Sequence, residues 1–177
     1  VSDQWLDAKK ELLISEYRAS HDAMTGLWNK TSGLDRIRDS FKDMTEGDRA
    51  VLGFVDIDNF KSVNDTYGHE NGDFWIREIA AALQEMCEPA DIACRYGGDE
   101  YILFLKNIEA GDALTARIES FRKRVHDKAA ERKQDVHCSI GFCQIKGAGR
   151  DLSECIAIAD KLLYQAKEIG KDTYVIG

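Results

Sequence analysis

A glycine hairpin interrupts an otherwise regular alternation of helices and strands in this sequence. The segment RYGGDEY, residues 95–101, places two adjacent glycines between two apolar runs, which is typical of a β-hairpin with a two-residue loop. The other β-rich runs are separated by stretches of helical periodicity, an order that favours parallel strands. We therefore expect an α/β fold, with a mixed central sheet of about five strands, helices on both faces and the glycines on a hairpin turn. The expected strands are residues 50–58, 92–96, 100–105, 136–145 and 173–176.

The first expected helix, residues 3–20, differs from the others in having only a narrow apolar stripe. The stripe consists of two pairs seven residues apart, Trp5 with Leu12 and Leu6 with Leu13. Such a helix either packs on its own domain or connects the domain to another segment. The other expected helices are residues 33–43, 59–68, 73–87, 111–131 and 152–168.

Length and charge limit the classes of partner. The 177 residues favour one domain with an appendage, which we place at residues 21–177 and 1–20. With 44% hydrophobic and 32% charged residues, the composition is that of an ordinary globular protein. The net charge of −8 argues against nucleic acid or an anionic membrane surface as a partner. A polyanionic ligand would therefore need a locally positive site or a bridging cation.

The cysteines and the apolar runs indicate the compartment. The five cysteines are odd in number, have no CxxC spacing and lie mostly in apolar runs, so we expect reduced core residues. No apolar stretch approaches the roughly 18 residues of a membrane span, and no signal peptide is present. We expect a cytoplasmic domain without direct membrane insertion, belonging to a longer protein.

Acidic residues occur where two of the expected strands end. Asp56 terminates one apolar run, and a two-residue loop would place Asp99 opposite Tyr96, with Asp99 and Glu100 on opposite faces. If strand 50–58 lies beside the hairpin, Asp56 and Asp99 meet at one edge of the sheet. Two close carboxylates repel each other unless a cation lies between them. Oxygen ligands of this kind favour Mg²⁺ or Mn²⁺.

Two other interpretations of these acids remain open. They are ordinary polar strand ends, or they begin a calcium loop, because DIDNFKSVNDTY places Asp56 and Asp58 as an EF-hand loop would. The calcium pattern fails at its sixth position, where Lys61 replaces glycine, and at its twelfth, where Tyr67 replaces glutamate.

Taken in order, several motifs resemble those of the GGDEF-domain diguanylate cyclases. RYGGDEY resembles the family signature, with tyrosine in place of the final phenylalanine. A lone GGDE would be weak, but the resemblance extends over residues 21–177 and the motifs keep the family's order. The other matching segments are DAMTGLWNK (22–30), DIDNFKSVNDTYGHENGD (56–73), SIGF (139–142) and ADKLLYQAKEIGKD (159–172).

The resemblance implies an enzyme with a nucleotidyl-cyclase-like fold that converts two GTP molecules into cyclic di-GMP and two pyrophosphates. Each domain of a homodimer would hold one GTP, and the 3′-hydroxyl of each nucleotide would attack the α-phosphate of the other. The resemblance also implies Mg²⁺ or Mn²⁺ as cofactor. An upstream sensory domain would be joined through a helix such as residues 1–20.

By resemblance, the acids near the hairpin form the catalytic centre. Asp56 and Asp99 would bind the metal ions with the backbone carbonyl of Ile57, and the metals would lower the pKa of the attacking hydroxyl. Glu100 belongs to the signature; its role would be proton transfer or metal-shell support, unless it is purely structural.

Asn64 and Asp73 match the family's guanine-binding positions. The Watson–Crick edge of guanine offers two donors, which a carboxylate such as that of Asp73 accepts. Adenine presents an acceptor there and would be rejected. Taken alone, Asp73 could instead cap a helix, and Asn64 could be a solvated helix residue.

Phosphate binding is implied for lysines and for backbone amides. The Gly97–Gly98 turn lacks side chains, so a phosphate could lie against its amides. A helix start offers further free amides. Taken singly, each lysine would more often be a solvated surface charge. The implied residues are Lys61, Lys167, Lys171, Asn59 and Phe60.

The chain departs from the family pattern at two places. Lys171 stands where arginine is common, which keeps the charge but loses the bidentate fork. The product-binding inhibitory motif R-x-x-D is replaced by EPAD, with Glu88 in place of arginine and Asp91 retained. Because a glutamate cannot pair with a phosphodiester, we expect this inhibitory site to be absent.

The same residues bear on three alternatives to an active cyclase. A catalytically silent module that binds GTP or cyclic di-GMP would be expected to lack signature acids or base-binding residues, and none is missing. A hybrid cyclase that joins GTP to ATP is disfavoured by Asp73. A cyclase that closes one nucleotide on itself is disfavoured by the order of the motifs alone.

Overall fold

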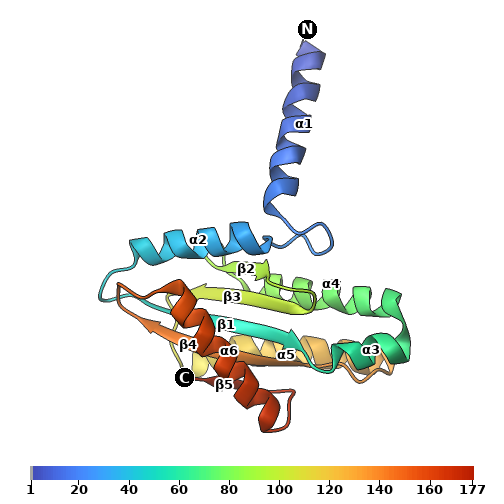
Figure 1. Ribbon diagram of the computed structural model, residues 1–177, viewed down its shortest axis with the longest axis vertical. Coiled ribbons are helices and arrows are strands. Elements are labelled where there is room, and N and C mark those ends of the chain that lie inside the picture. Colours follow the sequence, from blue (N-terminus) through green and yellow to red (C-terminus); the bar gives the residue numbers. More distant parts are fainter. Residues whose placement is uncertain (1) are drawn as a thin grey trace.

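The computed structural model describes residues 2–177, and its centre is a five-stranded sheet with strand order β2-β3-β1-β4-β5 (Figure 1). Strand β1 pairs antiparallel with both β3 and β4, whereas β4 and β5 are parallel. The expected mixed α/β sheet is therefore confirmed. The elements are α1 (Ser2–Ser20), α2 (Lys30–Asp43), β1 (Arg49–Ile57), α3 (Phe60–Tyr67), α4 (His69–Met86), β2 (Ile92–Arg95), β3 (Glu100–Lys106), α5 (Asp112–Arg132), β4 (Cys138–Lys146), α6 (Leu152–Glu168) and β5 (Tyr174–Ile176).

Helices cover both faces of the sheet. The side chains of β1 alternate between the faces, because successive residues of a strand point in opposite directions. Val51 and Val55 pack in one core with α4 and α5, and Leu52 and Phe54 pack in a second core with α2 and α6. Both faces of the central strand are thus buried, which explains its nearly continuous apolar sequence.

The hairpin loop is longer by one residue than the sequence predicts. Arg95 lies opposite Tyr101 in the β2–β3 ladder, and the amides of Tyr96 and Gly97 both donate to the carbonyl of Glu100, at 2.8 and 3.1 Å. The predicted two-residue loop with Tyr96 opposite Asp99 is therefore wrong. The loop contains three residues, 97–99, and Asp99 lies in the turn rather than in β3.

Helix α1 projects away from the sheet and its covering helices (Figure 1). It buries none of its side chains, and its stripe is exposed, with Trp5 60% and Leu12 58% accessible to solvent. The alternative that this helix packs along its own domain is therefore wrong. Within residues 2–177, no helix has both the length and the apolar character needed to cross a bilayer.

Two helices begin earlier than periodicity predicts. Helix α2 begins at Lys30, not at residue 33, because the Asn29 side chain caps it by accepting from the Ser32 amide at 2.9 Å. Helix α4 begins at His69, directly after Gly68, whose φ of 92° turns the chain between α3 and α4. All five cysteines are free, as expected, and only Cys87 is less than fully buried.

Candidate active site

Three acidic residues, Asp56, Asp99 and Glu100, lie in one region where β1 ends beside the hairpin. Asp56 lies directly opposite Glu100 in the β1–β3 register. The Ile57 amide donates to the Asp99 carbonyl at 3.3 Å, which ties the hairpin loop to the end of β1. The structure thus brings Asp56 and Asp99 together as expected, although Glu100, not Asp99, occupies the position paired with Asp56.

Burial, together with the proximity of other carboxylates, raises the pKa of Asp99 and that of Glu100. Burial and the adjacent Asp56 carboxylate raise the pKa of Asp99 to about 7. Burial, followed by the charges of Asp56 and Asp160, raises the pKa of Glu100. The cluster therefore carries more negative charge than its surroundings stabilise, and a cation placed there would be bound favourably.

One cation already lies at this cluster. Lys167 of α6 forms an ion pair with Oδ2 of Asp56. Burial lowers the pKa of Lys167, but the hydrogen bond and the charge of Asp56 outweigh that effect and raise it overall. The other oxygen of Asp56, Oδ1, is buried without a hydrogen-bond partner. An unpaired buried carboxylate oxygen is costly, which indicates that this atom faces a ligand position.

The donor set at this position is small. Within residues 2–177, no three His, Cys, Asp or Glu side chains converge closely enough to hold a metal ion by themselves. The two carboxylates of Asp56 and Asp99 nevertheless fit Mg²⁺, which is commonly bound by one or two carboxylates and completed by water and substrate phosphates. The residues present therefore fit a metal that binds together with a phosphate ligand.

Close packing, not backbone conformation, explains the first glycine of the hairpin. Neither Gly97 nor Gly98 has a positive φ. A Cβ atom on Gly97 would lie 2.5 Å from Oε1 of Glu100, whereas one on Gly98 would meet nothing within 4 Å. Gly97 thus leaves room for the Glu100 carboxylate, and Gly98 leaves the outside of the turn open.

Arg95 holds the hairpin loop in place, a function that the sequence reasoning missed. Its guanidinium donates to the carbonyls of Gly97 and Gly98, at 3.2 and 2.8 Å, and forms an ion pair with Asp22 at 3.2 Å. Burial raises the pKa of Asp22, but bonds from Thr25 and Arg95 lower it overall. Asp22 begins the segment DAMTGLWNK and Arg95 begins the segment RYGGDEY. The sequence does not indicate that these two residues pair with each other.

Helices α3 and α4 bring the two expected base-binding residues into one region. A Cβ atom on Gly72 would lie 1.8 Å from Oδ1 of Asn64, so the Asn64 side chain lies directly against the residue before Asp73. The alternative that Asp73 caps a helix is wrong, because α4 begins at His69 and its N-cap is Gly68. Asp73 is partly buried in the second turn of the helix.

The expected phosphate-binding residues form two groups. Lys171 donates to Oδ1 of Asn59 at 2.7 Å, which places it at the N-terminus of α3 together with Asn59 and Phe60. Lys61 is exposed on the same helix. Lys167 lies instead at the carboxylate cluster. The structure therefore divides these positive charges between the start of α3 and the end of β1.

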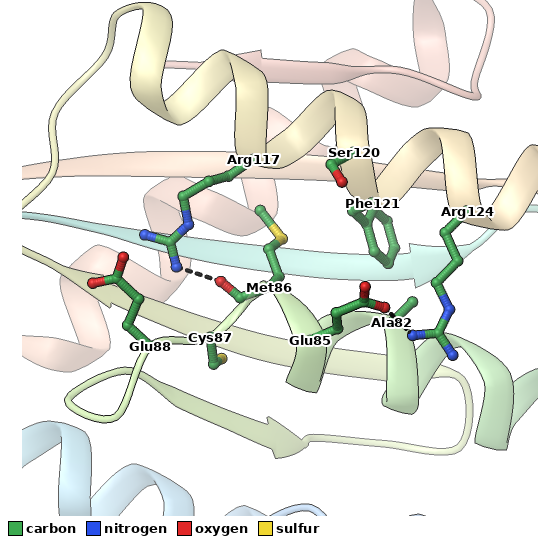
Figure 2. Close-up of a pocket in the computed structure, with 9 residues that line it drawn as sticks. All are labelled: Ala82, Glu85, Met86, Cys87, Glu88, Arg117, Ser120, Phe121 and Arg124. Atoms are coloured by element: carbon green, nitrogen blue, oxygen red, sulfur yellow. Dashed lines mark hydrogen bonds and ion pairs between the residues drawn. The ribbon is translucent and has the colours of Figure 1, made fainter.

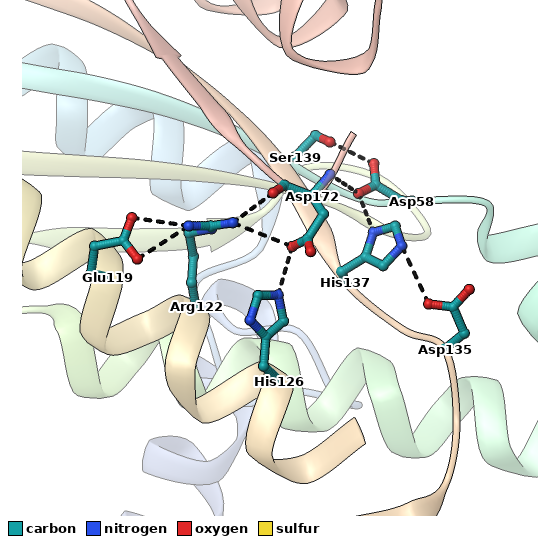
Figure 3. Close-up of polar contacts among 8 residues, drawn as sticks. All are labelled: Asp58, Glu119, Arg122, His126, Asp135, His137, Ser139 and Asp172. Atoms are coloured by element: carbon teal, nitrogen blue, oxygen red, sulfur yellow. Dashed lines mark hydrogen bonds and ion pairs between the residues drawn. The ribbon is translucent and has the colours of Figure 1, made fainter. Parts of the chain in front are cut away.

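Asp58 anchors the segment that carries Lys171 (Figure 3). Its side chain is buried and accepts from Nδ1 of His137 at 2.6 Å, from the Ser139 hydroxyl at 2.7 Å and from the Asp172 amide at 2.9 Å. Both carboxylate oxygens of Asp58 therefore accept hydrogen bonds from the protein. The residues that an EF-hand loop would occupy form helix α3 instead, so the calcium-loop alternative is wrong. No local pattern could have indicated this anchor, because its partners lie 79 to 114 residues away.

The EPAD segment is held by internal bonds. The carboxylate of Asp91, only 2% exposed, accepts from the amides of Glu88 and Lys106 at 2.9 and 2.8 Å and pairs with Arg117 at 2.7 Å. Arg117 also donates to the Met86 carbonyl at the edge of a pocket of about 270 Å³ between α4 and α5 (Figure 2). Asp91 thus has a structural function in the turn before β2.

Comparisons with known proteins agree with this fold. Residues 19–173 match the family model described as "Diguanylate cyclase, GGDEF domain". The chain is 35% identical, over 187 aligned positions and 98% of its length, to the bifunctional diguanylate cyclase/cyclic di-GMP phosphodiesterase MucR of Pseudomonas aeruginosa, of which it covers 27%. It is 33% identical to the response regulator PleD of Caulobacter vibrioides, covering 96% of this chain and 37% of that protein.

Solved structures give the same result. The diguanylate cyclase SiaD of Pseudomonas aeruginosa, solved with its activator SiaC, superposes with a TM-score of 0.81 at 31% identity, covering 99% of this chain and 69% of that one. The chain spans less than half the length of the first curated relatives that it matches.

Proposed function

This chain belongs to the GGDEF domain family of diguanylate cyclases, and from that membership we propose that it condenses two GTP molecules into cyclic di-GMP. The 3′-hydroxyl of each GTP attacks the α-phosphate of the other, the bond to pyrophosphate breaks, and two pyrophosphates leave. The observation that carries the proposal is that Asp56 lies beside Asp99 and opposite Glu100, with one buried oxygen of Asp56 unpaired.

Asp56 and Asp99, with the Ile57 carbonyl, would hold a divalent cation, Mg²⁺ or Mn²⁺. When bound, this cation polarises the phosphate and lowers the pKa of the attacking hydroxyl. Glu100 lies beside the cluster with a raised pKa, so its carboxylate is placed to accept a proton as the hydroxyl attacks. Gly97 keeps the space that this carboxylate occupies.

Guanine selection is assigned to Asn64 and Asp73. The Asp73 carboxylate accepts the two donors of the guanine Watson–Crick edge, and adenine would leave it unpaired. Asn64 lies against Gly72, so both side chains can contact one base. A site that depends on such hydrogen bonds discriminates by roughly 10⁴-fold.

The phosphates are assigned to the positive groups around β1. Lys171 lies at the N-terminus of α3, where the amides of Asn59 and Phe60 favour an anion. Lys61 lies one residue further along the helix. Lys167 pairs with Asp56 in the structure, and it would be placed to pair with a phosphate oxygen if a cation took its place beside Asp56.

Turnover requires a second copy of the chain, since each site holds one of the two nucleotides. The exposed stripe on α1 supports this requirement: an isolated helix with Trp5, Leu6, Leu12 and Leu13 open to water favours pairing with a like helix. Residues 1–20 would thus connect an upstream sensory domain to the catalytic domain and set how two domains meet.

The test is product analysis after incubation of the chain with GTP and Mg²⁺ at high protein concentration. We expect cyclic di-GMP from the wild type and from Asp65→Asn, a matched change at an exposed residue of α3, but not from Asp99→Asn. Equal product from Asp99→Asn would refute the assigned role of Asp99. GTP binding without product, even in a chain dimerised by a fused coiled coil, would favour the silent regulatory module.

A further inference from the structure

Two buried cysteines, Cys143 and Cys155, lie near a point of direct contact between helix α6 and strand β4. A Cβ atom on Gly141 would lie 2.1 Å from the Ala159 carbonyl and 2.2 Å from the Leu163 amide, so the backbones of β4 and α6 are in direct contact. Cys143 is two residues further along the same face of β4, and Cys155 is one turn before Ala159. The two residues belong to the same buried core.

The surroundings of this pair favour a thiolate on Cys143. Nη2 of Arg150 donates to Sγ of Cys143 at 3.8 Å, and Nη1 donates to the Gln144 carbonyl at 3.3 Å, which fixes the guanidinium beside the sulfur. The neighbouring Cys155 thiol and the charge of Arg150 lower the pKa of Cys143 below its ordinary value, against burial and the Glu154 carboxylate.

The remaining cysteines provide an internal contrast. Burial raises the pKa of Cys87 and of Cys94 to about 12, and burial also raises that of Cys138. Cys87 is nevertheless the most accessible thiol of the chain. If solvent access controlled reactivity, Cys87 would react first. If ionisation controlled it, Cys143 would react first, because the thiolate is the reactive form.

We propose that Cys143 and Cys155 form a peroxide-sensitive dithiol that closes to an intramolecular disulfide between β4 and α6. Helix α6 also carries Lys167, the partner of Asp56, so the disulfide would fasten a helix that borders the candidate active site. The proposal does not depend on GTP turnover.

The chemistry balances with hydrogen peroxide as oxidant. The Cys143 thiolate attacks one peroxide oxygen, the O–O bond breaks, and the leaving hydroxide takes a proton to become water. The product is a sulfenic acid on Cys143. The sulfur of Cys155 then attacks Sγ of Cys143, an S–S bond forms, the S–O bond breaks, and a second water leaves. Two thiols lose two electrons, and peroxide is reduced to two waters.

Peptide mapping after brief peroxide treatment tests the proposal. The reduced chain is exposed to hydrogen peroxide, alkylated and digested with trypsin without reduction. Cys155 falls in peptide 151–161, and Cys143 falls with Cys138 in peptide 134–146, so the experiment uses a Cys138→Ser background. We expect the two peptides to be linked, with the mass of two hydrogens lost and the link reversed by dithiothreitol.

Rates and variants separate the proposal from general oxidation. We expect Cys143 to be modified at least about tenfold faster than Cys87, because its thiolate is far more populated near neutral pH. Cys155→Ser should accumulate the sulfenic acid on Cys143 without a link, and Cys87→Ser should still form the link. Faster oxidation of Cys87, or further oxidation of Cys143 without the link in the Cys138→Ser chain, would overturn the proposal.

Discussion

Replacement of Asp58 by asparagine is expected to destabilise the domain by about 3–5 kcal/mol. The buried carboxylate accepts bonds from His137, Ser139 and the Asp172 amide. An asparagine amide offers one oxygen, so its NH₂ group would face at least one of these donors. Loss of the charged bond to His137 costs about 1.5–3 kcal/mol, and a buried donor left unpaired costs about 1–3 kcal/mol.

The same change should alter how stability depends on pH. The hydrogen bond to Asp58 raises the pKa of His137 above its ordinary value of 6.5, against the effect of burial. Above pH 6.5 the folded chain therefore holds a proton that the unfolded chain has lost, and stability falls as the pH rises through the folded pKa of His137. Asp58→Asn should remove most of this fall, because Asp58 is the main cause of the raised pKa of His137.

The carboxylate itself contributes at the acidic end. Burial raises the pKa of Asp58, but its hydrogen bonds lower it overall, below the ordinary value of 3.8. This stabilisation is present above pH 3.8 and is lost as the pH falls through the folded pKa. Asp58→Asn should remove it as well.

Urea unfolding at several pH values measures the loss of stability and its dependence on pH. In thermal unfolding, a loss of about 3–5 kcal/mol corresponds to a fall in Tm of roughly 10 °C or more. Asp135→Asn is the matched control, because Asp135 faces the other nitrogen of His137 at 3.5 Å with its side chain 90% exposed. It should change stability by less than about 0.5 kcal/mol. A loss under about 1 kcal/mol for Asp58→Asn, or an equal loss for the control, would refute this reasoning.

Further predictions concern packing, base selection and product binding. Gly141→Ala should lower urea-unfolding stability by about 3 kcal/mol or more, since its Cβ would meet the backbone of α6; Gly47→Ala, with open space, should change it by under about 1 kcal/mol, and similar losses would contradict the packing argument. Asp73→Ala should reduce the preference for GTP over ATP in competition binding by roughly 10²-fold or more, and an unchanged preference would exclude Asp73 as the guanine contact. Added cyclic di-GMP should leave the initial rate unchanged, because Asp91 is already bound by Arg117; strong inhibition that a substitution of Asp91 removes would show an inhibitory site.

The sequence predicts most of the fold, because the spacing of apolar residues along a helix or strand reflects which of its faces is buried. The strands and the mixed character of the sheet follow from alternation and from the hairpin, but the antiparallel pairing of β1 with both β3 and β4 does not. The hairpin register does not follow either, because the Glu100 carbonyl accepts two amides and Arg95 binds the loop carbonyls, contacts that leave no periodic trace. The start of α4 was missed for a similar reason, since its first turn is polar and follows a glycine turn.

The sequence predicts some parts of the candidate site better than others. Asp56 and Asp99, which carry the expected chemistry, stand next to apolar strand segments. An acidic residue in that position is easy to recognise in a sequence. Residues that hold others in place, such as Asp58 and Arg95, were missed because their partners lie far away in the sequence. The pairing of Lys167 with Asp56 across 111 residues was not evident either.

The strand order also determines when the domain can form during synthesis. Strand β1 is the centre of the sheet, yet its two neighbours are β3 and β4, which end at Lys106 and Lys146. As the chain leaves the ribosome, both edges of β1 stay unpaired until β3 has emerged, and one edge stays unpaired until β4 has emerged. Such distant pairing slows folding and exposes apolar strand edges. Chaperones should therefore bind nascent chains that end between β1 and β4 more than those that include both β4 and α6.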